Sequence, residues 1–349
     1  MTENKTYIVR VPATTANIGS GFDTLGMSLG LYNVVQFVPA EGIPLVDTKI
    51  EAEGEGADQI TEGLDNMIIK AMDETARQAG KSIPGGKMYL INRIPFARGL
   101  GSSSAAIASG VFLANMLMGE PFNRKEILDI TAAMEGHPDN AAPAILGGFC
   151  MALLKDGNVT AERIDIPSHW KAVVTIPDFE LHTEKARAVL PDSYPRSDAV
   201  HNIGAVSFLM AAFMYQKPEY LKLGLDDVIH VPYRLNLIPG ASDVIRNAER
   251  AGAYGATISG SGPTIIAFAP ADRAEKVGIA MVNGFAAAHI TSRYLVLDFD
   301  HNGIMAGRYP DFFYSPNGLP GRFFLDSKTR YTSKKEILRP FIGDSIDGR

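Results

Sequence analysis

Residues 99–104 read Gly-Leu-Gly-Ser-Ser-Ser, and this segment limits the local fold more strictly than any other part of the chain. Residues 87–94, rich in β-branched and aromatic side chains, precede it, and an apolar run to about residue 118 follows it. The pattern predicts a strand, a glycine-rich loop and a helix in direct succession. Glycine lets the backbone approach a ligand closely, and the free N–H groups of a helix N-terminus favour an anion. We therefore expect a phosphate-binding loop, or else a helix that is simply capped after a glycine turn.

The loop differs from two common nucleotide-binding loops. It contains no Gly-Lys-Ser/Thr, so it is not a Walker A loop. A serine stands at the third glycine of the dinucleotide pattern G-x-G-x-x-G, which argues against a Rossmann dehydrogenase. The hydroxyls of Ser102, Ser103 and Ser104 add hydrogen-bond donors, and one of them could coordinate Mg²⁺.

A second polar segment, residues 13–26, follows a short predicted strand at 7–11. It carries Asn17 and Asp23 among glycines and other small residues, so we expect a loop. An Asn and an Asp in such a loop can hold an ammonium or a hydroxyl group. The same residue types also form solvated Asx turns, and this loop alone does not distinguish the two.

A third polar segment, residues 135–140, reads Glu-Gly-His-Pro-Asp-Asn after a predicted helix at 124–134. A carboxylate near a phosphate loop can bind Mg²⁺, and Asn140 can orient a hydroxyl group. His137 is either a base or a hydrogen-bonded structural histidine. No second His or Cys stands at ligand spacing, so we expect no zinc site.

A glycine-rich segment in the second half, residues 259–263, reads Ser-Gly-Ser-Gly-Pro. It is too rich in glycine for a strand interior. It is typical of a backbone that closes against a ligand or another loop, or of a plain tight turn.

The remaining patterns predict several other elements and no repeat. Strands are expected at residues 32–38, 171–176, 256–258, 264–268 and 294–297, and helices at residues 66–79 and 273–285. Residues 141–152 are small and apolar, with a turn at Gly147-Gly148. The length of 349 residues allows two domains, and we expect the boundary at about residues 155–170.

Charge and cysteine content exclude several classes of protein. The net charge of −6 argues against a general nucleic-acid binder. The single cysteine, Cys150, allows no internal disulfide and suits a reducing cytosol, so we expect a cytoplasmic protein. Residues 1–11 include charged residues and no long apolar run, which is unlike a secretory signal. The apolar stretches 107–118 and 205–214 are shorter than the roughly 20 residues that span a bilayer, so we expect buried helices and no membrane segment.

Residues 301–349 form a tail of different composition, with Gly, Pro, Asn, aromatic and charged residues in no clear period. We expect a poorly ordered extension or a segment of cloning origin, and the alternative is a small interaction element.

Taken together, these segments resemble the motifs of the GHMP kinases. Residues 95–105 resemble their phosphate loop, P-x-x-x-G-L-G-S-S-x-A. Residues 11–26 are similar to the opening motif of the homoserine kinase family, V-P-A-T-(T/S)-A-N-(L/I)-G-x-G-F-D-x-x-G, with Ser20 where many members have proline. Residues 135–140 resemble the E-G-H-x-D-N segment of the same family, and residues 258–264 resemble the third motif. The resemblance runs from about residue 10 to about residue 300.

The resemblance implies an α+β, two-domain GHMP kinase fold. Residues 1–160 would form an ATP-binding domain like ribosomal protein S5 domain 2, and residues 161–300 a ferredoxin-like domain, with the active site between them. The cofactors implied are ATP and Mg²⁺, and the substrate implied is L-homoserine. A homodimer remains open.

The resemblance also implies roles for individual residues. Asn17 and Asp23 would hold the amino acid part of homoserine, with Asp23 facing the ammonium, while Arg187 and Arg234 would grip the carboxylate. Asn140, with His137 nearby, would contact the reacting hydroxyl, and Thr183 would lie near the transfer site. Ser103 and Glu135 would coordinate Mg²⁺, and Gly260, Ser261 and Gly262 would form a closing loop. Residues expected to bind ATP are Asn66, Pro95, Phe96, Ala97, Arg98, Gly99, Leu100, Gly101, Ser102, Ser103, Ser104 and Ala105, with Ile68 and Ile69 at the adenine pocket.

Phosphoryl transfer depends mainly on positioning and charge neutralisation. The related mevalonate kinases carry an aspartate base where this chain has Asn140, so we expect direct in-line attack without a strong carboxylate base. One alternative is a GHMP kinase for another small alcohol, such as mevalonate or a shikimate-like acid. The other is a non-catalytic sensor of the same fold, which should have lost a metal or substrate residue; all the matching positions are intact here.

Overall fold

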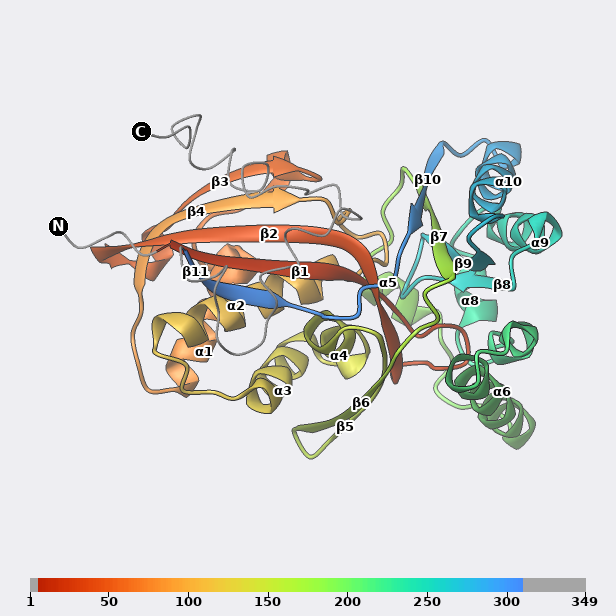
Figure 1. Cartoon of the computed structure of the whole chain (residues 1–349), viewed down its shortest axis with the longest axis horizontal. Coiled ribbons are helices and arrows are strands. Elements are labelled where there is room, and N and C mark those ends of the chain that lie inside the picture. The colour runs from red at the N-terminus through yellow and green to blue at the C-terminus, as the bar shows by residue number, and fades with distance from the viewer. Residues whose placement is uncertain (1–5, 310–349) are drawn as a thin grey trace.

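The computed structural model describes residues 6–309, which form two β-sheets placed end to end, each with its own helices (Figure 1). The larger sheet has the strand order β11-β1-β2-β4-β3, and β5 pairs with β2 and with β6. Only the β3–β4 pair is parallel. Its strands are β1 (Thr6–Ala16), β2 (Leu25–Pro44), β3 (Lys49–Gly54), β4 (Pro84–Asn92), β5 (Phe149–Lys155), β6 (Asn158–Ile164) and β11 (Met305–Tyr309).

Four helices cover one face of this sheet (Figure 1). They are α1 (Met67–Gln78), α2 (Ser102–Leu117), α3 (Arg124–Glu135) and α4 (Pro138–Leu146). Helix α2 packs against α1, α3, α4 and β1, which explains why the sequence places apolar residues on all its sides. The predictions of strand, glycine loop and buried helix around residues 87–118 are confirmed.

The smaller sheet has the antiparallel order β10-β7-β9-β8, which is the ferredoxin-like order. Its strands are β7 (Trp170–Pro177), β8 (Gly255–Ile258), β9 (Ile265–Pro270) and β10 (Ser292–Leu297). Helices α9 (Ala241–Ala251) and α10 (Ala274–Ala287) pack on one face of this sheet. Four further helices lie between β7 and α9 in the chain. They are α5 (Thr183–Ala188), α6 (Arg196–Met214), α7 (Leu221–Gly224) and α8 (Val231–Leu235).

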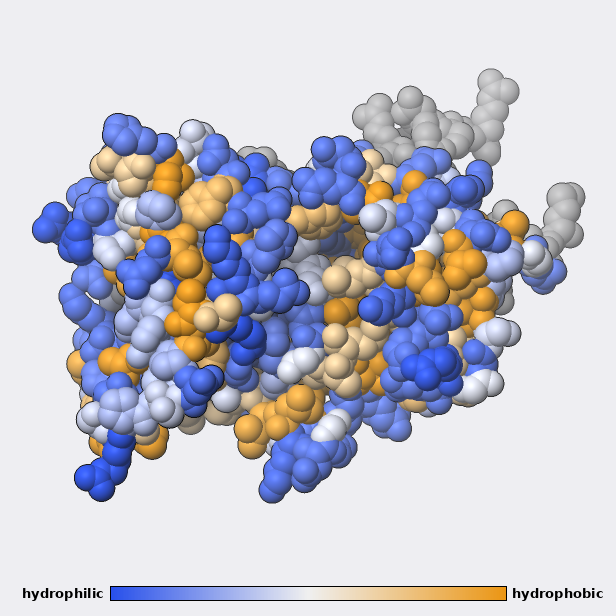
Figure 2. All heavy atoms as spheres, turned by 180° about the vertical axis from the view of Figure 1, so that it is seen from behind, coloured by the Kyte–Doolittle hydropathy of each residue, from blue (hydrophilic) through white to orange (hydrophobic). Residues whose placement is uncertain are grey.

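The core of the first domain continues into the second. Phe149 of β5 lies 4.5 Å, ring centre to ring centre, from Phe213 of α6, and Phe213 in turn contacts Trp170 of β7 and Phe268 of β9. Trp170 is fully buried. A shared apolar core of this kind fixes the relative position of the two domains. Seen from behind, both halves carry hydrophilic side chains mixed with hydrophobic ones (Figure 2).

Three expectations need correction. Residues 13–16 are not loop: β1 continues through them after a bulge, because Thr14 and Thr15 pair with Ser28 and Met27 of β2. Residues 205–214 lie in α6, but only one face of that helix is buried. Residues 305–309 belong to the expected tail, yet they form β11 along β1; the rest of the tail, residues 310–349, lies outside the described residues.

Strand β6 of the larger sheet ends at Ile164, and β7, the first strand of the smaller sheet, begins at Trp170. The domain limits expected at residues 1–160 and 161–300 stay a prediction. Strand β11 lies beyond residue 300 and pairs with β1 of the larger sheet. Within residues 6–309, no helix is both long enough and apolar enough to cross a bilayer.

Candidate active site

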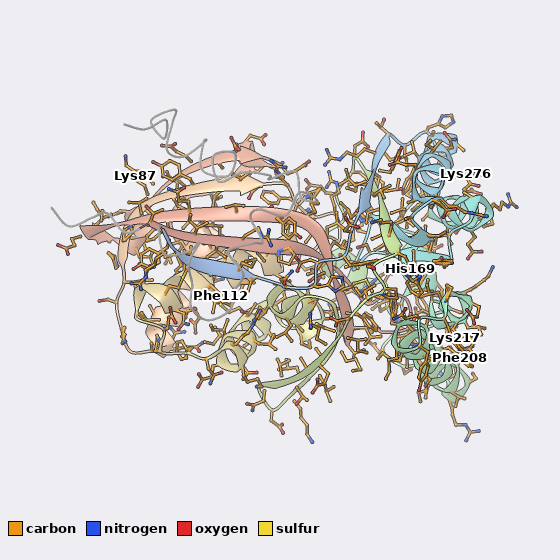
Figure 3. All side chains as sticks on the ribbon, in the orientation of Figure 1. Lys87, Phe112, His169, Phe208, Lys217 and Lys276 are labelled. Carbon is orange, nitrogen blue, oxygen red and sulfur yellow. The ribbon has the colours of Figure 1, made fainter. Side chains whose placement is uncertain are left out.

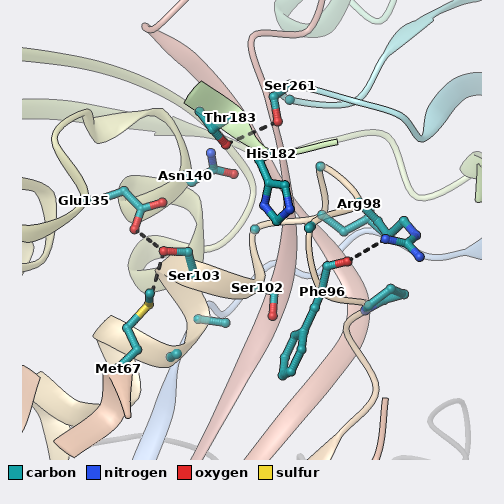
Figure 4. A pocket seen from close by; sticks show the side chains of 18 of the residues that line it. Met67, Phe96, Arg98, Ser102, Ser103, Glu135, Asn140, His182, Thr183 and Ser261 are labelled. Atoms are coloured by element: carbon teal, nitrogen blue, oxygen red, sulfur yellow. Dashed lines mark hydrogen bonds between the residues drawn. The ribbon is translucent and has the colours of Figure 1, made fainter. Parts of the chain in front are cut away.

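A cavity of about 440 Å³ lies between the two domains. The glycine loop, the start of α1, the start of α4 and the α5 region all contribute to its wall (Figure 4). Of the site residues predicted from the sequence, all line this cavity except Ile69, Ser104 and Gly262. Segments far apart in the chain therefore meet at one site.

Two positions of the loop require glycine. Gly99 has φ +72°, and a Cβ there would lie 2.1 Å from the Ser259 carbonyl oxygen. Gly101 has φ +71° as the N-cap of α2, and a Cβ there would lie 1.9 Å from Thr14 Oγ1. No other side chain fits at either position, because the loop is pressed between β1 and the loop after β8. The α2 N-terminus thereby stays open to the cavity, where its free N–H groups can donate hydrogen bonds to an anion.

The three serines of the loop point in different directions. Ser103 donates a hydrogen bond to Glu135 Oε2 over 3.0 Å, and both residues line the cavity (Figure 4). Ser104 is fully buried inside the helix packing, and its hydroxyl has no hydrogen-bond partner. The Ser103 and Glu135 oxygens fit Mg²⁺, which takes few protein ligands alongside phosphate and water. No group of three or more His, Cys, Asp or Glu within residues 6–309 could hold a metal.

Asn66 and Arg98 border the cavity, but their side chains form hydrogen bonds with backbone groups of the protein. Asn66 caps α1: its Oδ1 accepts from the backbone N–H groups of Ile68 and Ile69. The Arg98 guanidinium bonds to the Pro177 and Asp178 carbonyls at the end of β7, each at 3.2 Å. Arg98 thus links the phosphate loop to the second domain, and Figure 4 shows it directed away from Ser103.

Asp23 and Arg187 form a two-pronged ion pair across the domain boundary. Arg187 Nη2 lies 2.8 Å from Asp23 Oδ1, and Nη1 lies 3.0 Å from Oδ2. This hydrogen bond raises the pKa of Arg187. Asn17 fixes the loop that carries Asp23: its Oδ1 accepts from the Asp23 N–H, and its Nδ2 donates to the Gly260 carbonyl. Asn17 and Asp23 both have positive φ, a conformation that Asn and Asp tolerate better than most residues.

Arg234 is almost fully buried beside this pair, only 1% exposed. Its side chain donates to the Ala186 and Gly260 carbonyls and to His230 Nδ1. His230 Nε2 contacts the Gly19 carbonyl at 2.8 Å, so Nε2 carries the proton and Nδ1 is free to accept. Burial lowers the pKa of His230, which keeps the ring neutral. Phe22 stacks on the His230 ring, and Arg234 and Arg187 both lie over the Phe22 face.

The start of α4 brings three polar side chains to the cavity. Thr14 Oγ1 donates to Asn140 Oδ1 over 2.6 Å, which leaves the Asn140 amide N–H groups free to donate. His137 Nδ1 lies 2.6 Å from Asp139 Oδ1. Burial lowers the pKa of His137, but the hydrogen bond to Asp139 and its charge outweigh burial and raise it overall. On the facing side, Thr183 Oγ1 lies 3.4 Å from Ser261 Oγ (Figure 4).

Sequence reasoning missed several residues of this site. Asp139 and His182 line the cavity, while Phe22 and His230 form the layer behind Arg234. Asp139 and His182 each stand next to a predicted site residue, which was a usable signal. His230 gave none, because only the fold brings it to Arg234.

The fold and the site define a class. Residues 66–148 match the GHMP kinases N terminal domain, and residues 216–286 match the GHMP kinases C terminal domain. A crystal structure of mevalonate kinase superposes with a TM-score of 0.62 at 12% identity, over 84% of this chain and 99% of that chain, which shows a shared fold. The class is therefore the small-molecule kinases of the GHMP fold.

More similar proteins narrow the class. The chain is 43% identical to the homoserine kinase of Synechocystis sp., over 85% of this chain and 97% of the relative, and 43% identical to that of Carboxydothermus hydrogenoformans, over 79% and 89%. The crystal structure of homoserine kinase from Cytophaga hutchinsonii superposes with a TM-score of 0.78 at 29% identity, over 88% of this chain and 99% of that chain. The chain belongs to the homoserine kinase family of the GHMP kinases.

Proposed function

We propose that this protein transfers the γ-phosphoryl group of ATP to the hydroxyl group of L-homoserine, giving O-phospho-L-homoserine and ADP, a step of threonine biosynthesis in the cytoplasm. The observation that carries the proposal is the pairing, in one cavity, of a glycine-rich helix N-terminus with a carboxylate and two guanidinium groups. The helix N-terminus suits the phosphates of ATP, and the carboxylate with the two guanidinium groups suits a zwitterionic amino acid.

The amino acid end of the substrate would enter the Asp23–Arg187 pair. The ammonium group of homoserine would pair with the Asp23 carboxylate, and its carboxylate would pair with the Arg187 guanidinium. Asp23 and Arg187 would then each exchange the other for a charged group of the substrate. Arg234, held in place by His230 and two carbonyls, would supply the second cation. An acid without an amine would draw Arg187 away and leave Asp23 without a cation, and an uncharged sugar would leave the pair closed and gain nothing from either charge.

The reacting hydroxyl would lie near Asn140 and Thr183. A bond forms between the homoserine oxygen and the γ-phosphorus while the bond to the β,γ-bridging oxygen breaks, and the hydroxyl proton is released. The Asn140 side chain is an amide held by Thr14, so it orients the hydroxyl rather than removing its proton. A loose phosphoryl transfer needs little prior deprotonation, which supports in-line attack without a carboxylate base.

Charge neutralisation would come from the backbone N–H groups at the α2 N-terminus. Ser103 and Glu135 would hold Mg²⁺, which supplies further positive charge to the phosphate oxygens.

The test is ADP release by the purified chain with ATP and Mg²⁺ over a panel of L-homoserine, L-serine, mevalonate, shikimate and galactose. We expect the highest kcat/KM with L-homoserine. Preference for mevalonate or shikimate would select a kinase for another alcohol, and no release with any acceptor would favour a binding protein of the same fold.

A further inference from the structure

The loop that carries Asp23 is supported by the second domain. Residues 17–24 connect β1 to β2, and this connection runs from the larger sheet toward the end of the molecule where Phe208 and Lys217 are labelled in Figure 3. Its support is the segment of residues 224–231, which ends at the start of α8 and which we call the platform. The position of a carboxylate of the first domain therefore depends on a segment of the second.

Three contacts attach the loop to the platform. Ser20 Oγ donates to the Gly224 carbonyl over 2.6 Å. His230 Nε2 donates to the Gly19 carbonyl over 2.8 Å, and the His230 ring stacks on Phe22 with ring centres 4.9 Å apart. These loop residues stand shortly before the acidic residue of the loop, so the platform fixes the place of its carboxylate.

The same histidine also holds Arg234. Its Nδ1 accepts a hydrogen bond from Arg234 Nη1 over 3.2 Å. His230 and Arg234 are 0% and 1% exposed, so water does not compete for this bond. A neutral imidazole donates from one nitrogen and accepts at the other. One ring therefore ties the guanidinium to the loop of Asp23.

Asp227 fixes the histidine in turn. Its side chain is fully buried, and its Oδ2 accepts from the backbone N–H groups of His230 and Val231 over 2.8 and 2.7 Å. Helix α8 has only five residues, so such contacts, and not its own periodicity, decide where it begins. Oδ2 also lies 3.7 Å from His230 Nε2, where its negative charge favours the proton on that nitrogen.

The second oxygen of Asp227 argues against a purely structural role. Oδ1 is buried and has no hydrogen-bond partner. A buried polar atom without a partner costs stability, so an uncharged side chain would serve better if only the backbone had to be held. The charge has a counterpart in the site: burial lowers the pKa of Arg234, and Asp227 is among the carboxylates that oppose this.

We propose that His230 is a positioning residue that holds Arg234 and the loop of Asp23 at a fixed separation, with Asp227 as its anchor. An α-amino acid carries its ammonium and carboxylate groups on the same carbon atom, so a fixed separation lets the site bind both groups at once. The inference rests on the proposed function, because it concerns the site assigned to L-homoserine.

Two substitutions separate the two ring nitrogens. In His230→Gln the side-chain amide can still donate to the Gly19 carbonyl, but nothing replaces the acceptor at Nδ1; in His230→Asn the side-chain oxygen replaces that acceptor but not the donor. We expect His230→Gln to raise the KM for L-homoserine about tenfold, because the guanidinium loses a hydrogen bond that orients it. The KM for ATP should stay close to wild type.

A double-mutant cycle with Arg234→Ala identifies the path of each effect. Once Arg234 is removed, His230→Gln should change the KM for L-homoserine by no more than about twofold, because it acts through that guanidinium. His230→Asn should keep its full effect in the same background, because it acts through Gly19 and the loop of Asp23. A histidine that only stabilised the fold would give additive effects in both cycles.

Asp227→Asn tests the anchor. The asparagine keeps an oxygen for the two backbone N–H groups and loses the charge, so we expect a rise of about threefold in the KM for L-homoserine. Asp226→Asn is the matched control, since the Asp226 side chain is 63% exposed, and its kinetics should equal those of the wild type. Circular dichroism establishes that each variant is folded.

Several outcomes would overturn the proposal. An unchanged KM for L-homoserine in His230→Gln would do so, and additivity of His230→Gln with Arg234→Ala would do so as well; both results would leave the proposed function intact. If His230→Gln does not fold, the cycle is run with Asp227→Asn, where additivity has the same meaning. A wild-type chain that transfers no phosphoryl group to L-homoserine would overturn the proposed function and this inference together.

Discussion

At the scale of single residues, Arg234 is a buried cation that lines the cavity where we propose that the substrate binds. Burial lowers the pKa of Arg234, which is the cost of holding a cation away from water. Neutral acceptors surround much of the guanidinium: the His230 ring and the carbonyls of Ala186 and Gly260. They orient the group without neutralising it, so its charge remains available to a carboxylate.

We expect Arg234→Ala to raise the KM for L-homoserine by roughly 10- to 100-fold, because a hydrogen bond to a charged group is worth about 1.5–3 kcal/mol. The KM for ATP should change little, since the hydrogen bonds of the Arg234 side chain go to Ala186, His230 and Gly260 and not to the phosphate loop. Steady-state kinetics with each substrate varied in turn measures the difference. Arg246→Ala, an exposed arginine of α9, is the control; equal increases in both KM values for Arg234→Ala would remove Arg234 from the homoserine site.

His137 gives a prediction about stability and pH. Its pKa is raised above the ordinary value of 6.5, so the protonated ring is favoured in the folded state. The stabilisation is therefore complete below pH 6.5 and is lost as the pH rises through the folded-state pKa. His137→Gln should lower the free energy of unfolding more at pH 5.5–6 than at pH 8.5, by up to about 1–2 kcal/mol. Urea unfolding at the two pH values measures this, and an equal loss at both would contradict it; in an Asp139→Asn background the difference should shrink.

At the scale of elements, the loop and helix around residue 101 could be predicted because their signals are local. Glycine, the preceding strand and the apolar run stand side by side in the sequence. The helices between β7 and β8 could not be placed in the same way, because α5, α7 and α8 have only 6, 4 and 5 residues. Such short helices form through tertiary contacts rather than through their own periodicity. The sequence predicts a loop at Thr14 and Thr15 because the glycines that follow outweigh the preference of threonine for strands.

The orientation of helix α2 separates two serines that the sequence could not distinguish. Ser103→Ala removes a hydroxyl that points at Glu135 within the cavity, so we expect kcat/KM for Mg·ATP to fall about tenfold or more. Ser104→Ala removes a buried hydroxyl that has no partner, so it should leave kinetics close to wild type. ADP release at several Mg²⁺ concentrations measures both. Unchanged kinetics for Ser103→Ala would transfer the metal role to Ser102 or to another oxygen.

At the scale of the whole molecule, the site exists only where the two domains meet. Asp23 and Arg187 are 164 residues apart in the chain, and no periodicity predicts that they pair. The motif resemblance implies that Asp23 contacts the ammonium of the substrate and that Arg187 contacts its carboxylate. It does not indicate that the two residues bind each other. The same applies to Arg98: its place in the phosphate loop suggested ATP, whereas the fold turns it toward β7.

Arg98 therefore provides a test of how the domains cooperate. Its guanidinium bonds to carbonyl groups of Phe96 in the first domain and of Pro177 and Asp178 in the second, and lies 3.5 Å from Glu180. If Arg98 holds the domains in register, Arg98→Ala should raise the KM for ATP and the KM for L-homoserine together, because Asp23 and Arg187 come from opposite sides of the boundary. A loss of about 1–3 kcal/mol would also lower the melting temperature, by about 2–4 °C for each kcal/mol.

The alternative role for Arg98 is direct contact with a phosphate of ATP. Steady-state kinetics and the melting temperature distinguish this role from that of holding the domains in register. A phosphate contact would raise the KM for ATP alone and leave the melting temperature of the ligand-free protein unchanged. Arg293→Ala serves as the comparison, since Arg293 of β10 also crosses the boundary, to Glu55, through an ion pair exposed at the surface. Exposed ion pairs contribute little to stability, so Arg293→Ala should have a much smaller effect on the melting temperature and on both KM values than Arg98→Ala.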